Sequence, residues 1–188
     1  MAPINSKNDV FNAETVSNVA LQTAQSQLGQ SEQPIGSNSG PMVSEYLKAV
    51  GLPPGYAWCQ AFAYWCYAVA SKKVNKPNPV IKTASVHECW GHSSNGHGIT
   101  KLLKEDALKH PELIKPGDQF ILFFGGNAGH TGLVEKISWF DEAHHDKGAV
   151  IHTIEGNSNN NGSREGYEVV RHQRYINDKT LQGFIQYS

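Results

Sequence analysis

The sequence has almost no net charge. It contains 16 Lys and Arg residues against 17 Asp and Glu residues, which gives a formal net charge of -1, and it has no long run of Lys or Arg. Because such a balance lacks the basic footprint of a nucleic-acid-binding protein, we expect no nucleic-acid partner. A net charge this close to zero also gives the protein little attraction to an anionic surface. We therefore expect ligand binding to depend on a shaped site rather than on overall charge.

Long hydrophobic runs are missing as well. Residues 1–12 are polar and lack the apolar core of a secretion signal. The longest uncharged stretch covers residues 49–71 and is about as long as a membrane span, but Gly and Pro at 51–55 interrupt it near its start. We expect no membrane span. The length fits one domain, which we place at residues 13–188 after a flexible tail at 1–12.

Cysteine is scarce. The chain has three cysteines, and an odd number fits a free thiol better than a disulfide framework. Cys59 and Cys66 are seven residues apart, so on one helix they lie roughly 10 Å apart along the axis, too far for a disulfide. Cys66 is expected in the core. Pairing of Cys66 with Cys89 stays open at this point.

Cys59 is the most informative of the three cysteines. It follows the turn sequence Pro53-Pro54-Gly55 and begins an uncharged segment with helical apolar spacing. The free N–H groups and the positive dipole end of a helix N-terminus favour a thiolate over a thiol. A thiolate is the attacking species in cysteine catalysis. The alternative is a buried cysteine that only fills core space.

A cysteine nucleophile needs a base, and the base needs a group that orients it. His130 starts one predicted strand after a glycine-rich turn, and Glu155 and Asn157 belong to another. Residues two apart share a strand face, so Thr153, Glu155 and, if the strand continues, Asn157 point the same way. If the strands pair, Glu155 or Asn157 accepts a hydrogen bond from Nδ1 of His130. The Nε2 atom would then face Cys59.

Three short motifs occur in a fixed order along the chain. They are Trp58-Cys59 followed by Ala61-Phe62, then Gly129-His130-Thr131-Gly132, then Glu155-Gly156-Asn157. As an ordered set they resemble the CHAP domain, the cysteine, histidine-dependent amidohydrolase/peptidase. The segments 36–41, 115–118 and 162–166 also look like bacterial members of that family. The resemblance covers roughly residues 20–188.

The resemblance implies a papain-like fold and cleavage of amide bonds in bacterial peptidoglycan, in the stem peptide or between muramic acid and alanine. It implies that Cys59 is the nucleophile, His130 the base and Glu155 the orienting acid. Asn157 matches a fourth polar position in part of the family. Some phage members carry an Asp-rich calcium loop before the cysteine. The corresponding segment here, residues 37–40, has no carboxylate, so the resemblance carries no metal over.

A second cluster of metal-ligating residue types lies downstream of Cys59. Its members are His87, Cys89, His92 and His97. Their spacing matches none of the common zinc templates, so we predict a polar loop near the groove, with no metal and no other cofactor. The two His and one Asp at 144–146 lie in a polar turn between strands and are expected to be solvated.

Aromatic residues near the motifs are candidates for substrate binding. Tyr56, Trp58 and Trp90 could stack on sugar or peptide, although such residues more often pack in a core or at a rim. The Tyr56 hydroxyl, three residues before the nucleophile, is a candidate to reach the reacting carbonyl. The backbone N–H of Cys59 is expected to contribute to an oxyanion hole.

The apolar spacing predicts helices in the first half of the chain and strands in the second half. The predicted helices are 14–28, 42–50, 59–71 and a short one at 100–109. The predicted strands are 119–124, 131–139, 149–155, 167–175 and 184–187. This order favours an α+β class, papain-like, with N-terminal helices packed on a C-terminal antiparallel sheet.

The leading hypothesis is a monomeric cysteine hydrolase that acts on the cell wall, as an antibacterial effector or a phage lysin. An effector would have a cognate inhibitor protein. Without a visible signal, export would occur by cell lysis, by a secretion machine or after removal of a leader. One alternative keeps the chemistry but acts on a small γ-glutamyl or polyamine amide. Another is a non-catalytic wall-binding module, which is disfavoured because all three catalytic positions are filled.

Overall fold

The computed structural model describes residues 14–93, 96, 98–138, 149–159 and 166–187. The helices are α1 (Val16–Ser26), α2 (Pro41–Ala49), α3 (Cys59–Lys73), α4 (Val86–His92), α5 (Lys104–Lys109) and the 3-10 helix η1 (Pro111–Leu113). The strands are β1 (Ile99–Leu103), β2 (Gln119–Gly125), β3 (Ala128–Ser138), β4 (Val150–Ser158), β5 (Glu168–Tyr175) and β6 (Leu181–Tyr187).

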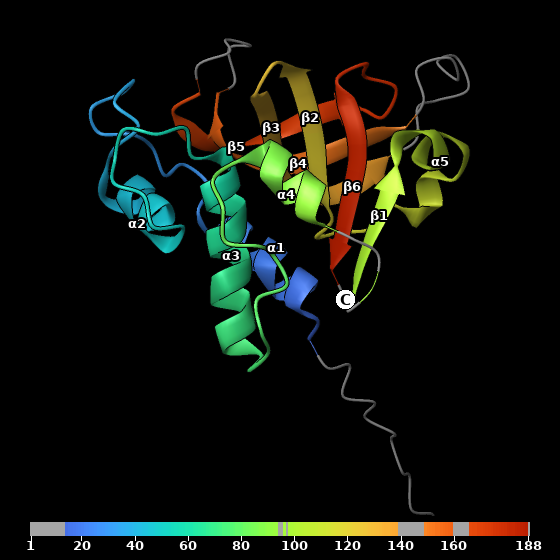
Figure 1. Ribbon diagram of the computed structural model, residues 1–188, viewed down its shortest axis with the longest axis horizontal. Coiled ribbons are helices and arrows are strands. Elements are labelled where there is room, and N and C mark those ends of the chain that lie inside the picture. The colour runs from blue at the N-terminus through green and yellow to red at the C-terminus, as the bar shows by residue number, and fades with distance from the viewer. Residues whose placement is uncertain (1–13, 94–95, 97, 139–148, 160–165, 188) are drawn as a thin grey trace, which may run out of the picture.

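The strands form one sheet in the order β1-β6-β2-β3-β4-β5, and all neighbours are antiparallel. In Figure 1, α1, α2 and α3 gather on one side of this sheet, and α5 lies beyond β1 at its other end. Helix α3 contacts α1, α2, β3 and β4. It is therefore the element that joins the helical half of the chain to the sheet.

Two hydrophobic clusters lie on opposite faces of the sheet. One cluster joins α1, α2 and α3 to side chains such as Ile121 and Ile154. The other joins α5 to side chains such as Phe120 and Leu122. Phe120 and Leu122 thus face one way and Ile121 the other, as the two-residue period of a strand requires. The sheet is covered on both faces, and its end near α3 is free to carry a site.

The predicted fold class is confirmed: the protein is α+β, with N-terminal helices packed on a C-terminal antiparallel sheet. The first three predicted helices are present as α1 to α3, and the five predicted strands as β2 to β6. Among the helices that the structure describes, none is long and apolar enough to cross a membrane.

Two local predictions were wrong. The segment predicted as a helix at 100–109 is divided between strand β1 and helix α5, because β1 pairs along its whole length with β6. Sheet pairing therefore overrides the local apolar spacing. The segment predicted as a polar loop around Cys89 is helix α4. The Ser85 side chain caps it by accepting a hydrogen bond from the Glu88 N–H, and Val86 and Cys89 are its buried residues.

Candidate active site

Cys59 is the first residue of α3, as the sequence predicted. Its backbone N–H belongs to the first turn, where a helix offers no internal acceptor. The side chain is only 6% exposed, yet it lines a cleft of about 480 Å³. The thiol therefore sits at the positive end of a helix and at the edge of a cavity large enough for a peptide segment.

His130 lies in β3, opposite Leu122 of β2, and lines the same cleft. Its Nε2 atom is 2.7 Å from Oε2 of Glu155 in the adjacent strand β4. A hydrogen bond also links His130 to Cys59. The three residues implied by the resemblance are thus brought together, with the imidazole between the thiol and the carboxyl group.

The ring orientation of His130 differs from the predicted one. We expected Nδ1 to bond the carboxylate, whereas Nε2 does so and Nδ1 is left for Cys59. Strand alternation determines which face a side chain occupies, but rotation of the imidazole about χ2 determines which nitrogen meets which partner. The base that faces the thiol is therefore Nδ1.

Two glycines let strands β3 and β4 and helix α3 lie close to one another. A Cβ at Gly132 would lie 2.5 Å from the Ile154 carbonyl oxygen and 2.9 Å from Cγ of Glu155. A Cβ at Gly156 would lie 2.7 Å from the Phe62 ring of α3. Real Cβ atoms do not tolerate such distances, so only glycine fits at these positions. The glycines of the second and third sequence motifs hold β3, β4 and α3 close enough for catalytic contact.

The pKa of His130 is set by opposing effects. Burial lowers it, but the hydrogen bonds with Cys59 and Glu155 and the charges of both groups outweigh burial and raise the pKa to about 9. The imidazolium form is thus favoured at neutral pH. A positively charged ring therefore lies beside the Cys59 sulfur atom at neutral pH.

Glu155 is completely buried and belongs to a dense polar network. Arg174 of β5 donates two hydrogen bonds to it, from Nε to Oε1 and from Nη2 to Oε2, each 2.6 Å long. Thr153 donates to Oε1 at 2.6 Å and Ser158 to Oε2 at 3.3 Å. Although burial alone would raise the pKa of Glu155, Arg174 and His130 hold it well below its usual range. The ionised carboxylate is therefore the favoured form at neutral pH.

Arg174 was missed by the sequence prediction. Its guanidinium carbon also lies over the Phe120 ring, 5.3 Å from the ring centre. Arg174 pairs with Ile151 across β4 and β5, which places it on the strand face shared by Thr153 and Glu155. The sequence showed an arginine in a predicted strand but carried no information on that register.

Asn157 lines the cleft with Cys59 and His130 but does not receive the bond from the imidazole. The regular pairing of β4 with β5 is interrupted between Glu155 and Ser158. Asn157 lies in this irregular stretch and has a φ of 53°. Its amide is thus placed at the cleft surface rather than behind His130, which suits contact with a ligand better than orientation of the base.

The predicted substrate-binding aromatics do not line the cleft. Trp58 is completely buried and donates its Nε1–H to Glu32, so its assignment as a substrate contact was wrong. Tyr56 is 52% exposed, and Trp90 lies beneath the Lys101 ammonium, 4.7 Å from its ring centre. Neither belongs to the described residues that line the cleft. The exposed apolar groups that do line it are Ile35 and Phe124.

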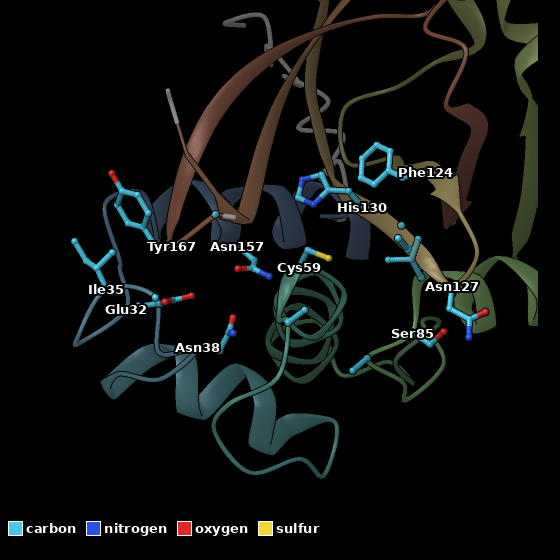
Figure 2. Close-up of a pocket in the computed structure, with 17 residues that line it drawn as sticks. Glu32, Ile35, Asn38, Cys59, Ser85, Phe124, Asn127, His130, Asn157 and Tyr167 are labelled. Atoms are coloured by element: carbon cyan, nitrogen blue, oxygen red, sulfur yellow. The ribbon is translucent and has the colours of Figure 1, made fainter. Parts of the chain in front are cut away.

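The cleft extends to both sides of Cys59 and His130. Figure 2 shows the Cys59 sulfur and the His130 ring in the middle, with one group of side chains on the left and another on the right. The left group contains Glu32, Ile35, Asn38 and Tyr167, and the right group contains Ser85, Phe124 and Asn127. A chain molecule could therefore run past the thiol and contact both groups.

The other two cysteines, and His87 and His92 of the histidine cluster, do not belong to the described residues that line this cleft. All three cysteines are free thiols, so Cys66 and Cys89 are unpaired. Burial raises the pKa of Cys89 to about 11 and that of Cys66 well above its usual value. His87 stacks on Phe123, and His92 bonds the Glu88 carbonyl of its own helix. Among the described residues, no group of three or more metal-ligating side chains converges; His97 and residues 144–146 lie outside them.

The fold and the site define the class first. A helix whose N-terminus presents a thiol to a histidine on an antiparallel sheet is the papain-like arrangement. The protein is therefore of the papain-like α+β class. The chain belongs to the CHAP domain family, whose sequence model matches residues 51–157. That match includes Cys59, His130, Glu155 and Asn157.

Comparison with solved structures adds support for the fold. The crystal structure of the wild-type endolysin LysIME-EF1 is similar to this chain, with a TM-score of 0.50 and 14% sequence identity. The similarity covers 91% of this chain and 63% of the endolysin chain, so the protein spans less than two thirds of that length. Comparison with curated proteins gave no match.

Proposed function

We propose that this protein hydrolyses amide bonds of bacterial peptidoglycan, in the stem peptide or between muramic acid and alanine, with Cys59 as nucleophile. One observation supports this most directly: His130 bonds a buried carboxylate through Nε2 and Cys59 through its other side, at the edge of an open cleft. Nucleophile, base and orienting group are thus in the relationship that covalent acyl transfer requires. Membership of the CHAP family supports the substrate class.

The reaction follows from these positions. The Cys59 thiolate attacks the amide carbon, and the developing oxyanion is close to the Cys59 backbone N–H. The His130 imidazolium gives its proton to the leaving nitrogen, so the C–N bond breaks, an amine departs and a thioester remains. His130 then takes a proton from water, and the resulting hydroxide attacks the thioester. The C–S bond breaks, the carboxylic acid leaves and the thiolate–imidazolium pair is restored.

The direct test is digestion of purified peptidoglycan followed by mass spectrometry of the soluble fragments. Cleavage should create one new amine and one new carboxyl group at a single kind of amide bond. The masses identify which bond is cut. Release of sugar fragments with intact peptides, or of no fragments, would contradict the proposal. Digestion of γ-glutamyl or polyamine amides in parallel tests the alternative substrates.

The pH dependence of hydrolysis should follow His130. Its imidazolium is the acid that protonates the leaving nitrogen, and its pKa is about 9, so kcat/KM should fall as the pH rises through about 9. The folded-state pKa lies above the ordinary value of 6.5, so the histidine pairing stabilises the fold below about pH 6.5. This stabilisation is lost as the pH rises through about 9.

Kinetics and thermal melting measured from about pH 6 to about pH 11 would check both effects. A rate that continues to rise beyond pH 10, about one unit above that value, would show that His130 is not the acid.

Alkylation of thiols should stop hydrolysis, whereas chelation of metal ions should not. EDTA should leave hydrolysis unchanged, because a thiolate–imidazolium pair needs no Lewis acid and residues 37–40 provide no carboxylate. Iodoacetamide should abolish hydrolysis and label Cys59 first, because Cys66 and Cys89 are completely buried and have raised thiol pKa values. Peptide mapping after brief labelling identifies the modified cysteine. Loss of activity in EDTA that calcium or zinc reverses would refute this expectation.

The biological setting follows from the same proposal. We propose a wall-directed lysin or an antibacterial effector that acts outside the cytoplasm as a monomer. For an effector, a cognate inhibitor protein would be expected to block the cleft around Cys59. Co-expression that restores growth of a host exposed to the active chain would identify such a protein. An inhibitor that binds equally well when the cleft is occupied by substrate would contradict this mode of inhibition.

A further inference from the structure

Glu32 lies in the wall of the cleft. One of its carboxylate oxygens has no hydrogen-bond partner in the described part of the chain. The residue is 2% exposed and lines the cleft with Cys59. One oxygen, Oε1, accepts the Nε1–H of Trp58 at 2.9 Å. The other, Oε2, is buried without a hydrogen-bond partner in the described part of the chain. Leaving a buried acceptor unsatisfied costs on the order of 1–3 kcal/mol, so such an atom calls for an explanation.

The backbone around Glu32 is held firmly. Its N–H donates to the Tyr167 carbonyl at 2.8 Å, and the next N–H, of Gln33, donates to the Ser39 carbonyl at 2.8 Å. Trp58, which binds the side chain, is completely buried and directly precedes the nucleophile. The position of the carboxylate is therefore fixed relative to Cys59. It does not depend on a flexible surface side chain.

Apart from His130, the described residues that line the cleft provide no positive charge to neutralise Glu32. The neighbouring side chains in Figure 2 are Ile35, Asn38, Asn157 and Tyr167, none of which is cationic at neutral pH. No Lys or Arg is found among the described residues that line the cleft. The other nearby carboxylate, Glu155, lies behind His130 and is already bonded by Arg174. Glu32 is thus the one cleft-lining carboxylate with an acceptor to spare among those residues.

We propose that Glu32 binds a primary ammonium group of the substrate, next to the amide that Cys59 attacks. An ammonium group has three N–H donors and a positive charge, and it can satisfy Oε2 while the amide oxygens of Asn38 or Asn157 accept its remaining hydrogens. The substrate class is thereby narrowed to peptides with a free amine close to the scissile bond. This inference rests on the proposed hydrolysis at the same cleft.

Two kinds of amine share this chemistry: the α-ammonium at a peptide N-terminus and the side-chain ammonium of a diamino acid. Three synthetic stem peptides separate them: one with both amines free, one acetylated on the α-amine and one acetylated on the side chain. The wild-type protein should lose about 10- to 100-fold in kcat/KM on acetylation of one of the two amines, the range given by a charge-assisted hydrogen bond. The sensitive amine is the one that Glu32 binds.

The variant Glu32→Gln keeps an oxygen that can accept the Trp58 N–H but removes the charge. In this variant the ratio of kcat/KM between the free and the acetylated peptide should fall to near one. Glu45→Gln is the matched control, because Glu45 is an exposed carboxylate on α2 that pairs with Lys48 away from the cleft. It should keep the wild-type ratio. If Glu32→Gln does not fold, Glu32→Asp, which withdraws the charge by one methylene, should lower the ratio in part.

Equal hydrolysis of free and acetylated peptides by the wild-type protein would overturn the assignment. Full discrimination retained by Glu32→Gln would also overturn it and would leave Glu32 as an anchor for Trp58. If the wild-type protein hydrolyses none of the peptides, cleavage within the stem peptide is refuted, and binding decides the role of Glu32 separately. Calorimetry with the Cys59→Ala protein should then show weaker binding of the acetylated peptide; equal Kd values would refute the role of Glu32.

Discussion

Replacing Cys59 with alanine should reduce peptidoglycan hydrolysis by about 10⁴-fold or more, because removal of a nucleophile from a catalytic unit removes the covalent route altogether. Cys59→Ser should be nearly as inactive, since a serine hydroxyl is not ionised by a neighbouring imidazolium. The measurements are the loss of turbidity of purified cell walls and the release of soluble fragments. The structural basis is the contact between Cys59 and His130 at the start of α3.

The control for this result is Cys66→Ala. Cys66 lies on the same helix but is completely buried in the core, with no contact to the cleft. Per folded molecule it should retain activity within about 2-fold, although its melting temperature should fall because a buried sulfur atom is lost. Comparable turbidity loss by wild type and Cys59→Ala would end the assignment of Cys59 as nucleophile.

Arg174→Met should have the largest effect on stability among the site variants. It leaves the completely buried Glu155 without its two guanidinium bonds, and breaking a buried ion pair by removing one partner costs about 3–5 kcal/mol. For a chain of this length each kcal/mol corresponds to about 2–4 °C in melting temperature, so a decrease of roughly 10 °C is expected. The kcat should also fall, because Glu155 then orients His130 less firmly.

Arg171→Met is the matched control on the same strand. Arg171 also makes a forked contact, to Glu135, but its side chain is 57% exposed. Such exposed pairs contribute about 0–1 kcal/mol, so this variant should melt within a few degrees of wild type and keep its kcat.

Arg174→Lys should have a higher kcat than Arg174→Met, because one charged donor to Glu155 remains. If Arg174 had a purely structural role, the lysine variant would regain stability but not kcat. Glu155→Gln should cost less activity than His130→Ala but should also destabilise, because Arg174 then lacks a counter-charge. An Arg174→Met protein with wild-type melting and wild-type kcat would refute the role of the ion pair.

Local sequence signals predicted the placement of residues that depends on short segments. The turn of Pro and Gly before Cys59 marked the start of α3, and strand alternation placed Thr153 and Glu155 on one face. The pairing of His130 with Glu155 followed from the resemblance and from adjacent strands. These inferences succeeded because each depends on residues close in sequence or on neighbouring strands.

Contacts that depend on long-range packing could not be predicted from the local sequence. Arg174 meets Glu155 only through the register of β4 and β5, in which Arg174 lies opposite Ile151. Glu32 reaches the cleft because the segment before α2 folds over Trp58. Trp58 was misassigned for the same reason: sequence proximity to the nucleophile does not determine whether a side chain points toward the cleft or into the core.

The order of the site residues along the chain has a consequence for synthesis of the protein. Cys59 comes from the helical half, whereas His130, Glu155 and Arg174 belong to strands β3 to β5. A ribosome-bound chain exposes its thiol well before the base, the carboxylate and the arginine have been made. Under the proposed function, the growing polypeptide should therefore lack hydrolytic activity until β5 pairs with β4. A chain that ends before residue 174 should likewise be inactive, because it lacks all of β6 and the arginine that binds Glu155.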